Sequence, residues 1–407
     1  MAIGHLVVNV FVDNVAQPLM GARVNISGNN TNINVVTDES GRTEAIALEA
    51  PNIEYSLEPQ TIVQPWETYN VTVTKDGLGT GTVLGVQVYA GITSIQDVYL
   101  STTTGGSGKI TTIVPPPTIW DNEVPKIVEH PEIGSLESKV LPRVVIPEYI
   151  IVHDGIPTDT YAPNYYVSFS DYIKNVTSSE IYPSWPRETL KANVHAIVSF
   201  TLNRVYTEWY YSKGYNFTIT SSTAYDQKYS HNRTIFDTIS NVVDEVFMEY
   251  LKFPGRSYPF FAQYSDGINV VREGWLSQWG SKSLGDQGYN SLQIVRYYYG
   301  NTIELVTAEI VPGLPTSFPG YNLTEGACGE EVQLLQNALN KIRGSYPAIP
   351  SIQKANGIYG PDTIEAVKVF QRVFNLPVTG IVNFATWYRI SAIFVAVSNM
   401  LKGIFNE

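Results

Sequence analysis

The first hundred residues alternate between apolar and polar side chains in short runs that are rich in β-branched residues. Residues 6–12 read Leu-Val-Val-Asn-Val-Phe-Val, and residues 71–73 read Val-Thr-Val. Turn sequences separate such runs, for example Asp76-Gly77 and Asp38-Glu39-Ser40-Gly41. Because successive side chains of a strand point to opposite faces of a sheet, this pattern predicts a small antiparallel β-sandwich over residues 1–100.

Residues 101–147 have a different character. The stretch 101–108 is Ser-Thr-Thr-Thr-Gly-Gly-Ser-Gly, which is typical of a flexible linker, and 115–117 is a stiff run of three prolines. A connection of this length is uncommon unless it has a function. We therefore expect a linker, which either only tethers two domains or offers an extended segment to a protease.

From residue 148 to residue 311 the pattern predicts a mixed α+β domain. Apolar residues follow Pro186 at helical spacing, from Leu190 through Val194 and Ile197. A second helix is expected from Thr234, whose side chain could form a capping box with Asp237. Extended runs such as 217–220 lie between and after these helices.

Residues 322–403 carry three further apolar stripes at helical spacing, separated by glycine-rich turns at 357–360 and 378–380. The stripes begin at Val332, Ile364 and Trp387. This pattern predicts a compact three-helix bundle at the C-terminal end.

Charge restricts the partners of the chain. It has 26 Lys and Arg against 38 Asp and Glu, and its formal net charge is −12. Nucleic acid and anionic membranes would be repelled, whereas a neutral glycan met by Tyr and Trp side chains would not. The N-terminus has no basic segment that would indicate a secretory signal, and no run reaches the length of a transmembrane helix. We therefore expect synthesis in a cytoplasm without a signal peptide, and no membrane partner.

Metal and cofactor sites are not indicated. The chain has one cysteine, Cys328, so neither an intramolecular disulfide nor a thiolate cluster can form. His153, His195 and His231 show no paired metal-ligand spacing. No metal and no cofactor are expected.

The C-terminal segment resembles the peptidoglycan-binding domain of the first type. The matching residues are Gly326, Gly329, Val332, Leu335-Gln336, Leu339, Asn356-Gly357-Ile358-Tyr359-Gly360-Pro361, Thr363, Ala366-Val367, Phe370-Gln371, Leu376 and Gly380. The resemblance implies wall binding, in which Gln336, Tyr359 and Gln371 could contact peptide stems. The alternative is that these residues only fill the core and form the turns of a bundle.

The central region resembles the SpoIID family of sporulation lytic transglycosylases. The matching segments are Tyr172-Ile173, Ser179-Glu180-Ile181-Tyr182-Pro183, Trp185-Pro186, residues 188–193, Ser221-Ser222-Thr223, Leu276-Ser277-Gln278-Trp279-Gly280, Gln287-Gly288-Tyr289 and residues 294–300. Two positions depart from the family: residues 271–275 replace a His-rich segment, and the family's helix Arg is replaced near Ile197-Val198. The roles of those groups are therefore not transferred to this chain.

Glu180 is the candidate catalytic acid, because glycosidic cleavage needs a carboxylic acid that is still protonated near neutral pH. It lies at a junction before a helix, and its neighbours Ile181, Tyr182 and Trp185 would raise its pKa by excluding water. In a lytic transglycosylase one acid is sufficient, since the C6 hydroxyl of N-acetylmuramic acid attacks its own anomeric carbon. Glu188 is the nearest competitor, although the first turn of a helix also favours an acid.

Five further residues are candidates for sugar binding through hydrogen bonds or stacking. They are Ser222, Thr223, Gln278, Trp279 and Tyr289. For each of them a purely structural role, in the core or in a turn, is an equal alternative.

The domain order resembles that of clostridial spore cortex-lytic enzymes of the SleC type, and the N-terminal segment resembles the carboxypeptidase-regulatory type of sandwich. The resemblance implies a zymogen whose sandwich and linker are removed by a Csp-type serine protease, near residues 139–148. It also implies action on cortex peptidoglycan in the spore. Two alternatives stay open: a zinc-dependent N-acetylmuramoyl-L-alanine amidase, and a non-catalytic peptidoglycan-binding or amidase-enhancer protein.

Overall fold

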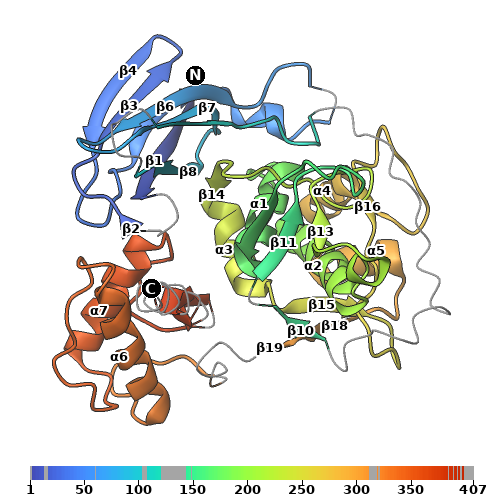
Figure 1. The fold of residues 1–407 in the computed structure, drawn as a ribbon. Coiled ribbons are helices and arrows are strands. Elements are labelled where there is room, and N and C mark those ends of the chain that lie inside the picture. The colour runs from blue at the N-terminus through green and yellow to red at the C-terminus, as the bar shows by residue number, and fades with distance from the viewer. Residues whose placement is uncertain are drawn as a thin grey trace.

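The computed structural model describes residues 2–12, 17–59, 61–102, 108–120, 144–147, 149–310, 319, 321–383, 385–387, 389–391, 393–394 and 397. Figure 1 shows three units: a sandwich of strands at the N-terminal end, a central domain of helices and short sheets, and a helical C-terminal module. The central domain contacts both of the other units.

The N-terminal unit consists of two sheets that share one apolar core. The first sheet contains β1 (Ala2–Val12), β2 (Gln17–Pro18), β5 (Ile46–Ala50) and β8 (Thr93–Leu100). The second contains β3 (Arg23–Gly28), β4 (Thr31–Val36), β6 (Glu67–Thr74), β7 (Thr80–Val88) and β9 (Lys109–Ile113). A short 3-10 helix, Ile53–Ser56, leaves the first sheet after β5.

The expectation of a purely antiparallel sandwich is wrong in two places. Strand β8 runs parallel to β1, and β9 runs parallel to β7. The chain passes from β7 in one sheet to β8 in the other and then returns to β9. Such crossings, unlike hairpins, do not force neighbouring strands to be antiparallel.

Part of the predicted linker belongs to the sandwich. Residues 109–113, Lys-Ile-Thr-Thr-Ile, are β-branched at four of five positions and add a strand beside β7. Residues 114–120 then lead from this strand towards the central domain. The remaining predicted linker up to residue 143, which includes much of the expected protease-sensitive stretch, lies outside the described residues.

The central domain is mixed α+β, as predicted. Its helices are α1 (Phe169–Glu180), α2 (Arg187–Tyr206), α3 (Asp237–Val246), α4 (Gln278–Asp286) and α5 (Ser291–Tyr299), with a 3-10 turn at Tyr211–Lys213. Among its short strands, β11 (Tyr149–His153) pairs on one side with β12 (Asn164–Ser168) and on the other with β13 (Ile219–Thr220). The remaining pairs are β15 (Glu249–Lys252) with β18 (Glu304–Thr307), β16 (Tyr264–Ser265) with β17 (Leu276–Ser277), and β10 (Val145–Ile146) with β19 (Glu309–Ile310).

The helix predicted after Pro186 is confirmed as α2, but it is buried around most of its circumference. It is surrounded by the other four helices of this domain and by strands β15 and β10. A helix enclosed in this way needs no polar face, so its apolar residues are not confined to one stripe. Helix α2 is therefore the centre of the domain core.

The capping box predicted at Thr234 is wrong. Helix α3 begins only at Asp237, and the Thr234 hydroxyl donates a hydrogen bond to the side-chain oxygen of Gln96 in the sandwich, at 2.7 Å. The two residues before the helix form strand β14 (Ile235–Phe236), which pairs with β8. The central domain thus adds a strand to the first sheet of the sandwich (Figure 1).

The C-terminal module contains α6 (Glu330–Arg343) and α7 (Pro361–Val373). The described positions between 385 and 397 are also helical, whereas residues 398–403 of the predicted third helix lie outside the described residues. Arg389 forms an ion pair with Asp171 of α1 at 3.1 Å, and Arg42 of the sandwich donates to the backbone oxygen of Arg372. None of the helices in the described ranges has the length and apolarity needed to cross a membrane.

Candidate functional site

Glu180 is the last residue of α1, and its side chain is buried, with a relative exposure of 4%. The turn 181–186 follows it and leads into α2. The sequence pattern predicted Glu180 just before a helix, whereas in the structure it lies at the end of α1, one turn before α2. Two packed helices therefore fix its position.

Four donors from distant parts of the chain surround the Glu180 carboxylate. One oxygen accepts hydrogen bonds from the backbone N–H of Lys228 at 2.9 Å and from the Tyr264 hydroxyl at 3.2 Å. The other accepts from the Thr118 hydroxyl at 2.9 Å and from the side-chain amide of Gln278 at 3.3 Å. The predicted apolar surroundings are thus only part of the environment of this acid.

Tyr264 remains a protonated donor in this site. Burial, and after it the negative charge of Glu180, raises the pKa of Tyr264 well above its usual value. The phenol therefore donates to the carboxylate throughout the physiological pH range.

Aromatic side chains pack together in the segments that hold this acid, since Tyr182 lies two residues after Glu180 and Trp279 follows Gln278. The ring of Trp279 lies 6.0 Å from that of Tyr182 and 4.9 Å from that of Trp185. Tyr182 and Trp279 also line a hollow of about 220 Å³, together with Asp266 and with Ile62 and Trp120 from the N-terminal part of the chain. Flat aromatic faces beside an acid are a common arrangement in sites that bind sugar rings.

The structure brings only some of the predicted sugar-binding residues to this place. Gln278 contacts Glu180 directly, and Trp279 lines the adjacent hollow. Ser222 and Thr223 lie in a turn after β13, and within residues 149–310 neither forms a hydrogen bond with Glu180. Tyr289 is exposed in the turn between α4 and α5.

The competing acid, Glu188, has a structural role in α2. One of its carboxylate oxygens accepts a hydrogen bond from the backbone N–H of Ser291 at 2.7 Å, at the first turn of α5. Its other oxygen lies 3.7 Å from the ammonium group of Lys191. Glu188 therefore joins two helices and satisfies a free N–H at a helix start.

The N-terminal part of the chain covers the site. Besides its hydroxyl bond to Glu180, Thr118 donates its backbone N–H to the carbonyl of Ser179 at 2.8 Å. The Ser56 hydroxyl lies 2.6 Å from that of Ser184, and the indole of Trp185 donates to the Ser56 carbonyl at 2.9 Å. The segment after β9 is thus bonded to the end of α1 that carries the candidate acid, and Ser56 is bonded to the turn that follows it.

Sequence reasoning did not identify Thr118, Lys228 and Tyr264 as neighbours of Glu180. They are 62, 48 and 84 residues away from it along the chain. Only the resemblance could have linked such positions, and Thr118 lies in the predicted linker, where no motif marks it.

The predicted wall-binding side chains Gln336, Tyr359 and Gln371 are buried within the C-terminal module. Gln336 donates to the Ile358 carbonyl and the Thr363 hydroxyl, and Gln371 accepts from the backbone N–H groups of 379 and 380. The Tyr359 hydroxyl donates to the carbonyl of 380 at 2.9 Å. These three side chains hold the two glycine-rich turns in place.

In the parts of the chain that the structure describes, no group of three or more His, Cys, Asp or Glu residues lies close enough to hold a metal ion. Cys328 is exposed on the C-terminal module.

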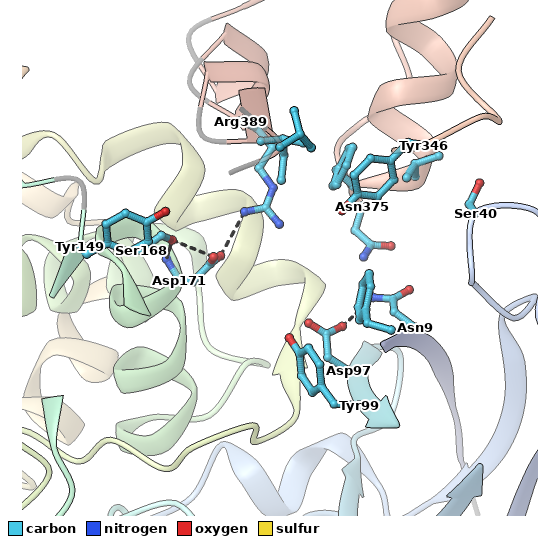
Figure 2. Close-up of a pocket in the computed structure, with 15 residues that line it drawn as sticks. Asn9, Ser40, Asp97, Tyr99, Tyr149, Ser168, Asp171, Tyr346, Asn375 and Arg389 are labelled. Carbon is cyan, nitrogen blue, oxygen red and sulfur yellow. Dashed lines mark hydrogen bonds and ion pairs between the residues drawn. The ribbon is translucent and has the colours of Figure 1, made fainter. Parts of the chain in front are cut away.

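A second hollow, of about 250 Å³, lies where all three units meet, and Figure 2 shows its lining. Asp97 of the sandwich accepts a hydrogen bond from the Asn9 amide at 2.8 Å. On the opposite side the guanidinium of Arg389 points to Asp171, as Figure 2 shows. None of the four residues that donate hydrogen bonds to Glu180 lines this hollow, and neither do Tyr182 and Trp279. It is therefore a junction between units rather than part of the candidate site.

Comparison with known protein families gives two matches. Residues 159–253 match the stage II sporulation protein family, SpoIID, and residues 328–390 match a peptidoglycan binding domain. No curated protein matches the chain. The first match includes Glu180 and α2 but ends before Gln278 and Trp279. The two matched domains together support a role for this chain on peptidoglycan, as a cell-wall lytic protein of sporulation or germination.

Proposed function

We propose that the chain is a lytic transglycosylase that cleaves the bond between N-acetylmuramic acid and N-acetylglucosamine in spore cortex peptidoglycan, with Glu180 as its acid and base. The observation that carries this proposal is the buried Glu180 carboxylate within the part that matches SpoIID. It is bound by Gln278, which precedes Trp279 of the aromatic hollow, and it lies two residues before Tyr182 of the same hollow. This is the function of spore cortex-lytic enzymes of the SleC type, which have the same order of domains.

In the proposed reaction, protonated Glu180 gives its proton to the glycosidic oxygen as the bond to the anomeric carbon breaks. The carboxylate then takes the proton from the C6 hydroxyl of the same muramic acid residue, whose oxygen attacks that carbon. The products are a 1,6-anhydromuramic end and a new free hydroxyl. The attacking hydroxyl is part of the substrate, which lowers the entropic barrier.

Around the acid, Gln278 and Tyr264 would orient the carboxylate, and Trp279 and Tyr182 would provide faces for sugar rings. Their hydrogen bonds fix both carboxylate oxygens relative to α1, so the proton is delivered in one direction. The site can act on a glycan only after Thr118 has left the carboxylate oxygen with which it is bonded.

The same contacts support zymogen control. Residues 114–120 and the loop around Ser56 lie on the site, so a glycan strand and the N-terminal part cannot occupy it together. We propose that a Csp-type serine protease cuts the chain near residues 136–148 during germination, and that the enzyme then acts on the cortex.

The test is mass spectrometry of the muropeptides released from decoated spores by the chain after it has folded, been cut at an engineered protease site within residues 121–143 and been separated from its sandwich. We expect 1,6-anhydro ends. Free stem peptides would indicate an amidase instead, and unchanged peptidoglycan would indicate a binding protein.

Glu180→Gln should lower the rate by at least about a hundredfold, because the amide cannot deliver the proton. Wall binding should not change. Glu188→Gln is the matched control, since Glu188 faces α5 and Lys191 rather than the hollow, and it should retain its rate. Full turnover by the Glu180→Gln variant would exclude Glu180 from the mechanism.

A further inference from the structure

Arg233 is a buried cation at the boundary between the central domain and the sandwich. It lies just before β14, in the segment that begins near Lys228, whose N–H binds Glu180. Its relative exposure is 3%. The Nε atom donates to the backbone carbonyl of Thr234 at 3.1 Å, and Nη2 donates to the side-chain oxygen of Gln87 at 3.2 Å.

The Arg233 charge lacks an acidic partner among the described residues. Its Nη1 atom is buried without a hydrogen-bond acceptor, and no carboxylate lies within ion-pair distance in the described ranges. Burial lowers the pKa of Arg233 to about 10, although the nearby Tyr89 and Glu180 act against this shift. The other buried arginine of this domain, Arg204, binds Asp226 at 2.8 Å.

An unpaired buried charge destabilises an interface, and a neutral side chain of similar size would pack there at lower cost. The hydrogen-bond partners of Arg233 in the intact chain are a backbone carbonyl and the Gln87 side-chain oxygen, and neither is charged. The group that completes its surroundings, Gln87 of β7, belongs to the part that must leave before the site can work. We therefore consider the role of Arg233 after the sandwich has left the central domain.

The surroundings of Arg233 belong to the candidate site. Arg233 lies five residues after Lys228, whose backbone N–H binds Glu180, and three residues before Phe236. The sandwich residue Tyr89 covers the rings of Phe236 and Tyr182, which lie 5.1 Å and 6.1 Å from its own ring. When the sandwich leaves, a guanidinium and two aromatic faces become accessible beside the acid.

We propose that Arg233 binds a carboxylate of the peptide stem of peptidoglycan, and that the Gln87 amide oxygen takes the place of this carboxylate in the intact chain. This proposal rests on the proposed function of the site. A guanidinium offers two parallel N–H donors, a geometry that fits a carboxylate, and both Nη atoms become free when Gln87 departs. Glycan alone carries no such group, so the stem is the part that Arg233 recognises.

The test compares glycan strands with intact stems and the same strands stripped of stems by an amidase. The chain is folded, cut within residues 121–143 and separated from its sandwich. For Arg233→Gln we expect KM on stem-bearing strands to rise about tenfold or more, the loss typical of a charged hydrogen bond. On stripped strands the KM of Arg233→Gln should equal that of the unsubstituted chain. On stem-bearing strands the KM of Arg233→Lys should lie between those of Arg233→Gln and the unsubstituted chain.

Arg256→Gln is the matched control, because it removes one positive charge from an exposed bend of the same domain. The Arg256→Gln variant should have the KM of the unsubstituted chain on both stem-bearing and stripped strands. An equal loss on both substrates in the Arg233→Gln variant, or no loss on either, would overturn the proposal.

Calorimetric binding of a disaccharide with a tripeptide stem separates this proposal from the proposed function. The Kd should rise about tenfold in the Arg233→Gln variant even if the chain forms no anhydro ends. Unchanged binding would overturn the Arg233 proposal. The absence of anhydro ends would overturn only the proposed transglycosylase activity. If Arg233→Gln does not fold, Arg233→Lys decides, and equal binding by that variant counts against a paired carboxylate.

Discussion

A single hydroxyl connects the N-terminal part of the chain to the candidate acid. The Thr118 hydroxyl donates to one Glu180 oxygen, and the neighbouring backbone N–H of Thr118 donates to Ser179. The second bond does not depend on the side chain. Substitution of Thr118 can therefore separate the contribution of the hydroxyl from that of the covering segment.

We predict that Thr118→Ala lowers the free energy of unfolding of the intact chain by about 1 kcal/mol, the typical net value of one hydrogen bond in a protein. Thr118→Ser should remain close to the original chain, because it keeps the donor. Both are measured by denaturant unfolding at pH 7. The lytic rate of intact Thr118→Ala should stay low, since the backbone segment still covers Glu180, and a fully active intact variant would contradict this.

Asp97 makes the junction in Figure 2 sensitive to pH. Burial raises the pKa of Asp97, although its bond from Asn9 acts in the opposite direction. An acid with a raised pKa in the folded state loses its proton at lower pH in the unfolded chain. Its ionisation therefore reduces stability as the pH rises from the usual aspartate value through the raised one.

We predict that Asp97→Asn raises the melting temperature of the intact chain at pH 7 and leaves it unchanged at pH 3. At the lower pH Asp97 is neutral in both states, and the asparagine oxygen can still accept the bond from Asn9. Asp76→Asn is the control, because Asp76 lies in an exposed pair with Arg23 and should have little effect at either pH. A lower melting temperature of Asp97→Asn at pH 7 would show that the charge of Asp97 stabilises the junction.

Among the elements, those that depend on local pattern could be predicted and those that depend on partners could not. The α2 helix follows from Pro186 and the apolar spacing after it, and the strands of the sandwich follow from alternation. Strand β14 consists of two residues, and only β8 defines it. The residues next to Thr234 in the sequence do not reveal whether its hydroxyl caps a helix or donates to Gln96.

The candidate site shows the same division. Glu180 and Gln278 could be proposed from motifs, and the structure places them in contact. In contrast, Gln336 and Gln371 were proposed as ligand groups because polar residues within a motif can serve either a ligand or a turn. In the structure both side chains are buried and bonded to backbone groups of the turns.

The β8–β14 pairing offers a test at the level of one element. Thr234→Val keeps the shape of the side chain but leaves the Gln96 oxygen without its donor at a buried position. We expect a cost of about 1–3 kcal/mol to the contact between sandwich and central domain. After the chain is cut, the sandwich should dissociate roughly tenfold faster or more, as 1.4 kcal/mol corresponds to a factor of ten.

Dissociation is followed by size-exclusion chromatography after dilution. Thr111→Val on the exposed face of β9 is the control and should not change the rate. If Thr234→Val and Thr111→Val released the sandwich equally fast, the β8–β14 pairing would not hold the two domains together.

In the whole molecule, each of the three units contacts the other two (Figure 1). The sandwich is joined to the central domain by a strand pair, by Trp185 and by Thr118. The C-terminal module is joined to α1 through Arg389. Because these contacts do not involve the chain connection itself, cutting the linker removes none of them.

We therefore predict that a cut within residues 121–143 is necessary but not sufficient for activity. At micromolar concentration the cut chain should elute as one complex and release few anhydro ends, because Thr118 still occupies the Glu180 oxygen. Dilution should raise the specific activity with a lag equal to the dissociation time of the sandwich, since the complex is then held only by mass action. Immediate full activity in fractions where the sandwich is still bound would contradict this, and would mean that the linker alone blocks the site.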